Sequence, residues 1–166
     1  MFTLLLKDYK KNIREHKKKI ILFLLFGSIF LFVGIYGFFQ KEKEQCEASI
    51  RFEGNILCVE VADTERKKSQ GLSFRKELEK DTGMLFIFEE KAFPKMWMKD
   101  MNFALDFIWM NSDGVVVDID ENVAPDTYPK IIDAPMATPF VLEVSAGFVK
   151  EYGIEKNMQM IISEKR

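Results

Sequence analysis

The chain has 166 residues with 24 Lys and Arg against 26 Asp and Glu, which gives a formal net charge of −2 and allows one folded domain with an additional segment. The charge is unevenly divided, because residues 40–166 hold 17 basic and 24 acidic side chains and so carry −7. This acidic part excludes nucleic acid as an expected partner. The one histidine, His16, lies outside it, which excludes from that part a Ser-His-Asp triad, a Cys-His dyad, a His-ligated zinc site and a histidine general base.

The first 39 residues predict a membrane anchor. Residues 1–19 form a basic arm, and residues 20–39 are twenty consecutive residues without a charge. As a helix this run spans about 30 Å, the thickness of the hydrocarbon core of a bilayer. The excess of Lys and Arg before it predicts a cytoplasmic N-terminus close to anionic lipid headgroups. The run is longer than the apolar region of a cleaved signal peptide, so we expect an uncleaved, single-pass signal anchor in the cell membrane.

Residues 40–47 form a short charged linker, and residues 48–166 are expected to form one extracytoplasmic domain. The lipid bilayer is therefore an expected partner of the chain, and the linker keeps the domain close to it. An exported domain is in a compartment where disulfides form.

The predicted distance between the two cysteines indicates whether such a bond is expected. Residues 48–52 and 56–61 predict a hairpin that places Cys58 opposite about Arg51, with Cys46 about five residues further along. At about 3.3 Å per residue this is a separation of about 16 Å, beyond the Cα distance of about 7 Å that a disulfide spans. We therefore expect no easy bridge between Cys46 and Cys58.

The remainder of the domain predicts short strands, a proline-rich loop and two short helices. The helices are expected at residues 65–70, after an Asp63 or Thr64 cap, and at 146–152, after a Ser145 cap. Further strands are expected at residues 84–88, 96–98, 105–110, 115–120, 140–144 and 158–162, with the loop at 124–139. The pattern predicts a mainly β, small α+β domain: a compact antiparallel β-barrel or sandwich with two short helices.

Asp106 is the sharpest candidate functional residue. On its predicted strand it shares a face with Ile108 and Met110, so its carboxylate is expected at the edge of the core. Burying a carboxylate without compensation is costly, so Asp106 must be ion-paired, hydrogen-bonded to backbone donors or protonated. Lys99 and Arg75 are the candidate partners. Two interpretations remain open: a structural carboxylate, or a group that binds a ligand or acts as an acid or base.

Trp97 and Lys99 share one face of a predicted strand. A tryptophan beside a cation suits the floor of a cleft for a sugar, a peptide or an anionic group, although Trp97 alone is equally typical of a core. The methionines at positions 96, 98 and 101 offer soft thioethers of the kind that bind Cu(I). Methionine more often fills irregular cores, so a copper site at Met96, Met98 and Met101 is the weaker interpretation, and no cofactor is expected.

Several motifs stand in the order in which the DUF192 family has them. They are Val59-Glu60-Val61-Ala62-Asp63-Thr64, Gly71-Leu72-Ser73-Phe74-Arg75, Gly83-Met84-Leu85-Phe86, Trp97-Met98-Lys99, Leu105-Asp106, Glu121-Asn122-Val123 and Val141-Leu142-Glu143-Val144-Ser145-Ala146-Gly147. Over about residues 59–160 the chain thus resembles this family. The resemblance implies a small β-rich fold and no established activity. Asp100 stands where the family often has Asn, which adds a charge beside Lys99.

The sequence favours a binding module over an enzyme. The leading hypothesis is a membrane-anchored extracytoplasmic module that binds or assembles with a carboxylate- or hydroxyl-bearing envelope ligand, such as a glycan or peptide, or with a membrane protein. Its cleft is expected to gather Arg75, Trp97, Lys99, Asp106 and Asn122. One alternative is a histidine-free hydrolase or transferase that uses Asp106 as general acid or base. Another is a purely structural subunit of a membrane complex.

Overall fold

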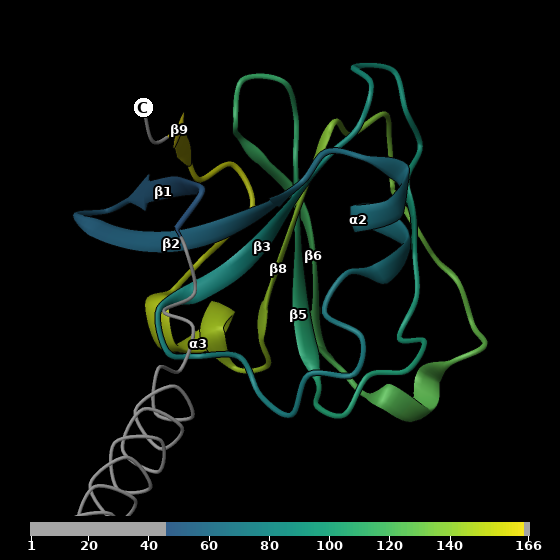
Figure 1. Cartoon of the computed structure of the whole chain (residues 1–166). Coiled ribbons are helices and arrows are strands. Elements are labelled where there is room, and N and C mark those ends of the chain that lie inside the picture. Colours follow the sequence, from purple (N-terminus) through teal and green to yellow (C-terminus); the bar gives the residue numbers. More distant parts are fainter. Residues whose placement is uncertain (1–45, 165–166) are drawn as a thin grey trace, which may run out of the picture. The chain divides into compact units, whose positions relative to one another are not determined.

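The computed structural model describes residues 46–164, in which two sheets and two short α-helices are formed (Figure 1). The strands are β1 (Ala48–Phe52), β2 (Asn55–Ala62), β3 (Thr82–Ile87), β4 (Lys95–Met96), β5 (Leu105–Met110), β6 (Val116–Val123), β7 (Ile132–Asp133), β8 (Phe140–Ser145) and β9 (Ile161–Glu164). The helices are α2 (Glu65–Gln70), the 3-10 turn η1 (Pro125–Thr127) and α3 (Phe148–Tyr152). Seven strands form one sheet in the order β6-β5-β8-β3-β2-β1-β9, and β4 pairs with β7.

The predicted mainly β fold with two short α-helices is confirmed, but the closed antiparallel barrel is wrong. β2 and β3 run parallel, so the large sheet is mixed. The reason is the connection through α2, which carries the chain back before β3 begins, as parallel pairing requires. Val115 forms an isolated bridge with Gln159, yet within residues 46–164 no ladder joins the edge strands β6 and β9. The sheet is therefore open.

The predicted cytoplasmic arm (1–19), the membrane span (20–39) and nearly all of the linker (40–47) lie outside the described residues. Among the helices that are described, none has the length and apolar character needed to cross a membrane.

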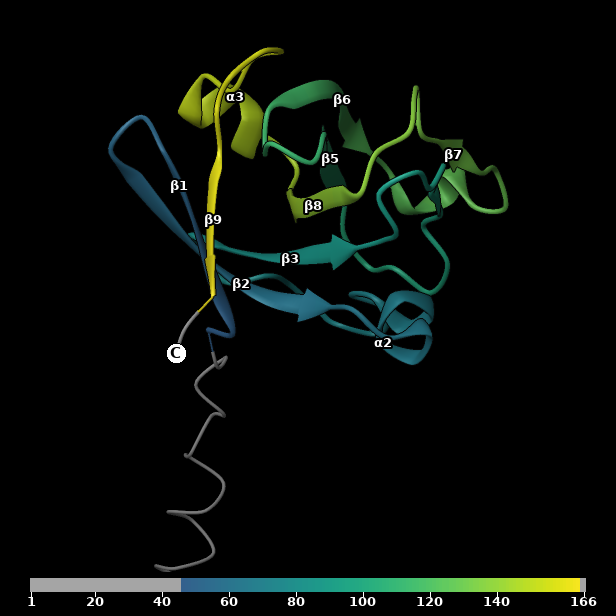
Figure 2. The ribbon, with the colours of Figure 1, turned by 90° about the horizontal axis from the view of Figure 1, so that it is seen from above.

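Two hydrophobic clusters lie in the domain because β5 is buried on both faces. Ile108 and Met110 belong to the first cluster, which also contains Phe148 and Val149 of α3. Alternate residues of β5, such as Phe107, belong to the second cluster, which extends to the β4–β7 region. Figure 2 shows α3 well apart from α2 and β7, in keeping with two separate clusters.

The hairpin of β1 and β2 has a different register from the predicted one. Its turn contains only Glu53 and Gly54, both with positive φ (42° and 83°), so Cys58 faces Ser49 and not Arg51. A two-residue turn of this kind matches the twist of the strands, and glycine takes positive φ at little cost. The shorter turn therefore moves Cys58 toward the N-terminal end of β1.

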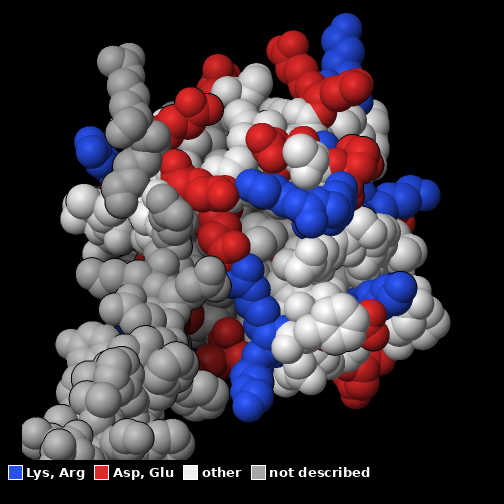
Figure 3. All heavy atoms as spheres, in the orientation of Figure 1, with Lys and Arg blue, Asp and Glu red and all other residues white. Residues whose placement is uncertain are grey.

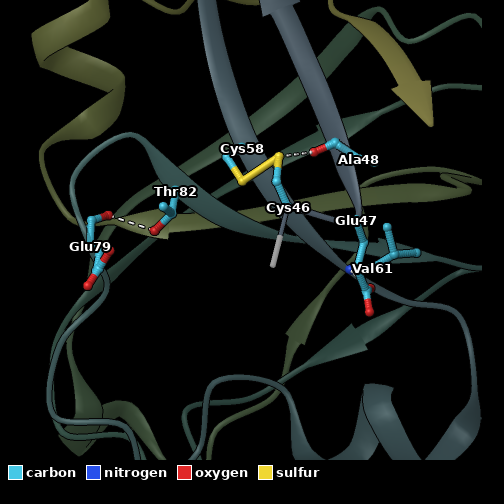
Figure 4. The surroundings of a disulfide bond; sticks show 7 residues. All are labelled: Cys46, Glu47, Ala48, Cys58, Val61, Glu79 and Thr82. Carbon is cyan, nitrogen blue, oxygen red and sulfur yellow. Dashed lines mark hydrogen bonds between the residues drawn. A yellow bond between two sulfur atoms is a disulfide. The ribbon is translucent and has the colours of Figure 1, made fainter. Parts of the chain in front are cut away.

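Cys46 and Cys58 form a disulfide, contrary to the expectation from the sequence (Figure 4). Their Cα atoms are 5.2 Å apart. The amide of Glu47 still donates to the Val59 carbonyl at 3.0 Å. At the next position of the ladder the acceptor is a side chain and not a backbone carbonyl. There the Glu47 carboxylate accepts the Val61 amide at 2.7 Å. A side chain thus takes this ladder bond, and Cys46 lies close to Cys58 of β2.

Candidate functional site

A pocket with a volume of about 210 Å³ opens beside α2, the turn that follows it and the region of β4. Its apolar lining is made of aromatic and thioether side chains: Leu72, Phe86, Phe88, Met96, Trp97 and Met101. Its charged lining is made of Glu65, Lys68, Lys95 and Glu143. The face of the domain that carries α2 shows basic beside acidic side chains and no field of a single sign (Figures 1 and 3).

Glu143 is the one carboxylate among these lining residues that is buried. It lies in the otherwise apolar strand β8, and only 4% of its surface is exposed. Its Oε2 atom is buried and has no hydrogen-bond partner. Burial raises the pKa of Glu143 to about 8, although the Arg75 guanidinium acts in the opposite direction. At neutral pH this carboxyl group is therefore mainly protonated, and it lies at the wall of a pocket with an unused polar atom.

Gly71 brings the backbone against the same carboxyl group. It ends α2 with φ of 50°, and its amide donates to the Lys67 carbonyl. A Cβ atom at this position would lie 3.3 Å from Phe86 and 3.9 Å from Glu143 Oε2. The positive φ and the contact with Phe86 both favour glycine here. The turn after α2 can thus lie directly over the pocket.

Arg75 places a positive charge near Glu143, while its guanidinium group is hydrogen-bonded to Glu60. The two side chains form a bidentate ion pair with N–O distances of 2.5 and 2.8 Å. The pair is about one quarter exposed on each side. This fork geometry orients the guanidinium, and its charge makes ionisation of Glu143 less costly than burial alone would.

The Gly71–Arg75 turn docks onto the Lys99–Asp100 segment through the main chain. Ser73 Oγ donates to the Lys99 carbonyl at 2.9 Å, and the Phe74 amide donates to the Asp100 carbonyl at 2.8 Å. Asp100 has φ of 57°, a region that Asn and Asp enter more readily than most residues. The two motifs, far apart in sequence, are therefore one structural unit that frames the pocket. The Lys99 side chain itself is exposed.

Asp106 lies on the other face of the sheet. It is fully buried, and its oxygens accept the backbone amides of Asn122 at 2.7 Å and Val149 at 3.0 Å. The pairing of β5 with β6 shifts register around it, and Asn122 has φ of 53°. These bonds come from main-chain amides and not from Lys99 or Arg75. The sequence left open whether Asp106 is ion-paired, hydrogen-bonded to backbone donors or protonated. This geometry favours a carboxylate that is held by backbone donors.

The five candidate residues thus do not converge on one site, and the exposed Lys99 side chain borders neither of the places described below. Trp97 lines the pocket and is half-buried, and Arg75 acts on Glu143 beside it. Asp106 and Asn122 meet through a main-chain amide behind the sheet. The exposed Asn122 side chain borders a separate open hollow near β7.

The three methionines are mainly packing residues. Met96 and Met98 are 6% and 1% exposed and belong to the second cluster, against which Met101 also packs. Met96 and Met101 line the pocket, and Met98 does not. Within the described part of the chain no group of three His, Cys, Asp or Glu side chains is arranged to hold a metal ion. The copper site stays a prediction without further support.

Glu143 was missed by the reasoning from sequence. The available signal was a single charged residue within the strand Phe140–Ser145, whose other positions are apolar or small. Alternation places Glu143 on the same side as Val141, which is fully buried. That side is covered by loops and α2, and only their path in space creates the pocket.

Comparison with protein families gives a match to the model of DUF192, described as Uncharacterized ACR, COG1430, over residues 48–162. A structure of a putative transcription regulator (R01717) from Sinorhizobium meliloti 1021 is 34% identical and has a TM-score of 0.63. That similarity covers 69% of this chain and 90% of the other.

A protein of unknown function from Novosphingobium aromaticivorans DSM 12444 is 27% identical, also with a TM-score of 0.63. The similarity covers 69% of this chain and 82% of that one. No curated protein matches the chain.

Proposed function

Because the chain belongs to the DUF192 family, whose description names no activity, we propose its function from the pocket: the domain binds a small cell-envelope ligand. The ligand lies between the aromatic wall that includes Trp97 and the carboxyl group of Glu143. The module carries out recognition and no chemical step.

The observation that carries this proposal is the unpartnered Oε2 atom of Glu143. Buried polar atoms are nearly always hydrogen-bonded, and leaving one without a partner costs about 1–3 kcal/mol. Such an atom at the pocket wall therefore lowers the stability of the folded domain. A ligand that displaces the atoms covering Oε2 and supplies the missing hydrogen bond recovers this free energy, which makes the site specific for polar groups of the right shape.

The walls suit a compact ligand with an apolar or ring-shaped body. Pockets that bind small molecules are mostly apolar with a few well-placed polar groups, as this one is. Its volume of about 210 Å³ matches one sugar ring or an amino-acid-sized group rather than a large cofactor. The half-buried Trp97 offers a flat surface for stacking.

The cellular setting of the proposal rests on the sequence and is supported by the disulfide. The basic arm and the apolar run at residues 1–39 suggest a membrane anchor with the domain outside the cytoplasm. The bond between Cys46 and Cys58 is of the kind that persists in oxidising compartments. An envelope glycan or peptide is therefore the proposed source of the ligand.

Catalysis by Asp106 has less support than binding. A general acid or base must reach a proton of the substrate, directly or through one water. The Asp106 carboxylate is fully buried and accepts two backbone amides, and it faces the cluster that contains α3.

A structural role in a membrane complex is favoured by one observation. Large apolar side chains are exposed in the loops around β4 and β7: Phe93, Tyr128, Ile131 and Met136. Exposed apolar surface is typical of contacts with other proteins. A size measurement of the full chain with and without a Phe93→Ser, Ile131→Ser double change tests for such self-assembly.

Ligand binding is tested with the full-length chain in detergent micelles, using N-acetylglucosamine and D-alanyl-D-alanine as probes. Trp97 lines the pocket, whereas Trp109 is fully buried, so a change in tryptophan emission reports on the pocket. We expect saturable changes for at least one probe, absent in Glu143→Leu. Trp97→Phe removes the reporter and serves to show that the emission change comes from Trp97. The absence of any change at millimolar concentrations of both probes would contradict the proposal.

A further inference from the structure

Within the sheet, Glu143 has no acidic neighbour on its own face. Strand β3 on one side of it carries no charged residue, and on the other side Asp106 of β5 belongs to the opposite face. The acidic side chains near the site form ion pairs with basic side chains. Glu60 of β2 binds Arg75, and Glu65 of α2 lies 3.3 Å from the Lys68 ammonium.

Cations border the pocket from two segments, and a third cation acts on Glu143 from outside the lining. Lys68 of α2 and Lys95 of β4 are among its lining residues, and Arg75 after α2 acts electrostatically on Glu143. The Lys68 ammonium lies 4.8 Å from the centre of the Phe88 ring and its side chain is only 16% exposed. This cation–π contact holds a positive charge over the aromatic wall and does not leave it free in solvent.

We infer that the ligand of this pocket presents a carboxylate, and that Glu143 binds it as a proton donor while Lys68 and Lys95 supply positive charge. This inference rests on the proposed binding function and specifies its chemistry. The hydrogen bond runs from the carboxylic acid of Glu143 to a ligand oxygen. Such a bond to an ionised acceptor is short and roughly twice as strong as one between neutral groups.

An ammonium ligand is the main competitor, and two effects disfavour it. It would meet the charges of Lys68, Lys95 and Arg75. It would also require Glu143 to ionise first, although burial has raised the pKa of that group to about 8. A carboxylate needs no such change at neutral pH, because the proton that it requires is already on Glu143.

The arrangement makes binding dependent on pH in a defined direction. Below about pH 8 the Glu143 proton is present and the carboxylate binds. Above this pH two carboxylates would face one another, and repulsion between like charges weakens the complex. An ammonium ligand would show the opposite trend, because ionised Glu143 attracts it.

The test uses three probes that differ only in the head group: phenylbutyrate, phenylbutanol and phenylbutylamine. Binding to the full-length chain is measured by saturation-transfer NMR and Trp97 fluorescence between about pH 6 and about pH 9, where the probe's own carboxylate and the lysines keep their charge. We expect phenylbutyrate to bind roughly tenfold more tightly than the amine at the lower pH and to lose that advantage at the higher pH.

The outcomes separate this inference from the proposed function. If the alcohol or the amine binds more tightly than phenylbutyrate, or if phenylbutyrate binding does not change with pH, the carboxylate assignment is overturned while the binding function stands. If none of the three probes binds while N-acetylglucosamine or D-alanyl-D-alanine does, the carboxylate assignment alone is overturned. If none of the five compounds binds, the binding function itself fails.

A matched pair of variants tests the role of the proton. Glu143→Gln places an amide donor that does not titrate, so we expect phenylbutyrate still to bind, now with the same affinity at both ends of the pH range. Glu143→Leu removes the donor and should abolish binding. If Glu143→Gln retains the pH dependence of the natural protein, the titrating group is not Glu143 and the inference is wrong.

Discussion

The carboxylate of Asp106 accepts the backbone amide of Val149 at 3.0 Å, across 43 positions of sequence. Val149 lies in the first turn of α3, where amides have no partner within the helix. The other oxygen of Asp106 accepts the Asn122 amide in the shifted part of β6. One buried side chain thus joins β5, β6 and α3.

Replacing Asp106 by Asn should destabilise the fold. The amide group of Asn can accept at only one oxygen, so one of the two buried amides loses its partner and faces another donor. We expect the free energy of unfolding to fall by about 2–3 kcal/mol, measured by urea denaturation of the full chain. The matched control is Asp113→Asn, which lies at an exposed hairpin turn and should change stability by less than about 0.5 kcal/mol. Equal effects of the two changes would contradict the structural role of Asp106.

Glu143 should make the stability of the domain fall as the pH rises. Its pKa is about 8 in the folded state and about 4.3 in the unfolded chain, so between these values the folded state binds more protons. The stabilisation is complete below about pH 4.3 and declines as the pH rises toward 8, by up to about 5 kcal/mol.

The matched change is Glu143→Gln, which keeps the shape of the side chain and does not titrate. We expect this variant to lose the decline and to be the more stable protein at about pH 8 in urea denaturation. If the natural protein and the variant have parallel pH profiles, Glu143 is ionised in the fold and its assignment as an acid is wrong.

Arg75 should influence both stability and the proton of Glu143. Arg75→Met removes the bidentate partner of Glu60 and the positive charge that lowers the pKa of Glu143. We expect a loss of about 1–2 kcal/mol, reduced by the partial exposure of the pair, and a further rise in the pKa of Glu143. The midpoint of the pH-dependent decline in stability measures that rise.

Arg75→Lys is the control that separates charge from geometry. It retains a cation but loses the fork that binds two oxygens at once, so stability should fall while the pKa of Glu143 moves little. An unchanged pH midpoint in Arg75→Met would show that the cation does not act on Glu143.

The disulfide should stabilise the domain through the unfolded chain. Cys46 and Cys58 are 12 positions apart, so their bond closes a short loop and removes about 3 kcal/mol of loop entropy from the unfolded state. The double change Cys46→Ser, Cys58→Ser should lower the free energy of unfolding by this amount and remove its sensitivity to reductant. Thiol labelling of the chain taken directly from cells gives the second measurement. Both cysteines should react only after reduction, and labelling before it would contradict an oxidised pair.

Much of the fold followed from local patterns in the sequence. Alternation along residues 105–110 placed Asp106 beside Ile108 and Met110 on one face, and the structure has all three buried in that strand. The mainly β class and the two short helices were predicted. These properties are set by neighbours within a few residues, so they can be read from the chain itself. The Thr64 cap of α2 is confirmed, whereas the predicted Ser145 cap is wrong, because α3 begins after Gly147 without a side-chain cap.

The groups that these residues contact could not be predicted from local patterns. Lys99 and Arg75 were the expected partners of Asp106, and the structure gives it backbone amides of residues 122 and 149 instead. A bulge in β6 and the position of α3 decide this, and neither is encoded in the residues next to Asp106. The same is true of Cys46, whose bond to Cys58 depends on a two-residue turn and on the Glu47 side chain.

The sequence by itself thus determined the charge division of the chain, the class of the domain, the burial of Asp106 and the lack of histidine beyond residue 16. Only the tertiary structure decided that Glu143 and Trp97 border one pocket and that Asp106 does not. The physical reason is that a side chain's burial follows from its own strand. Its partners depend on register and crossover connections, which bring together segments that are far apart in the chain.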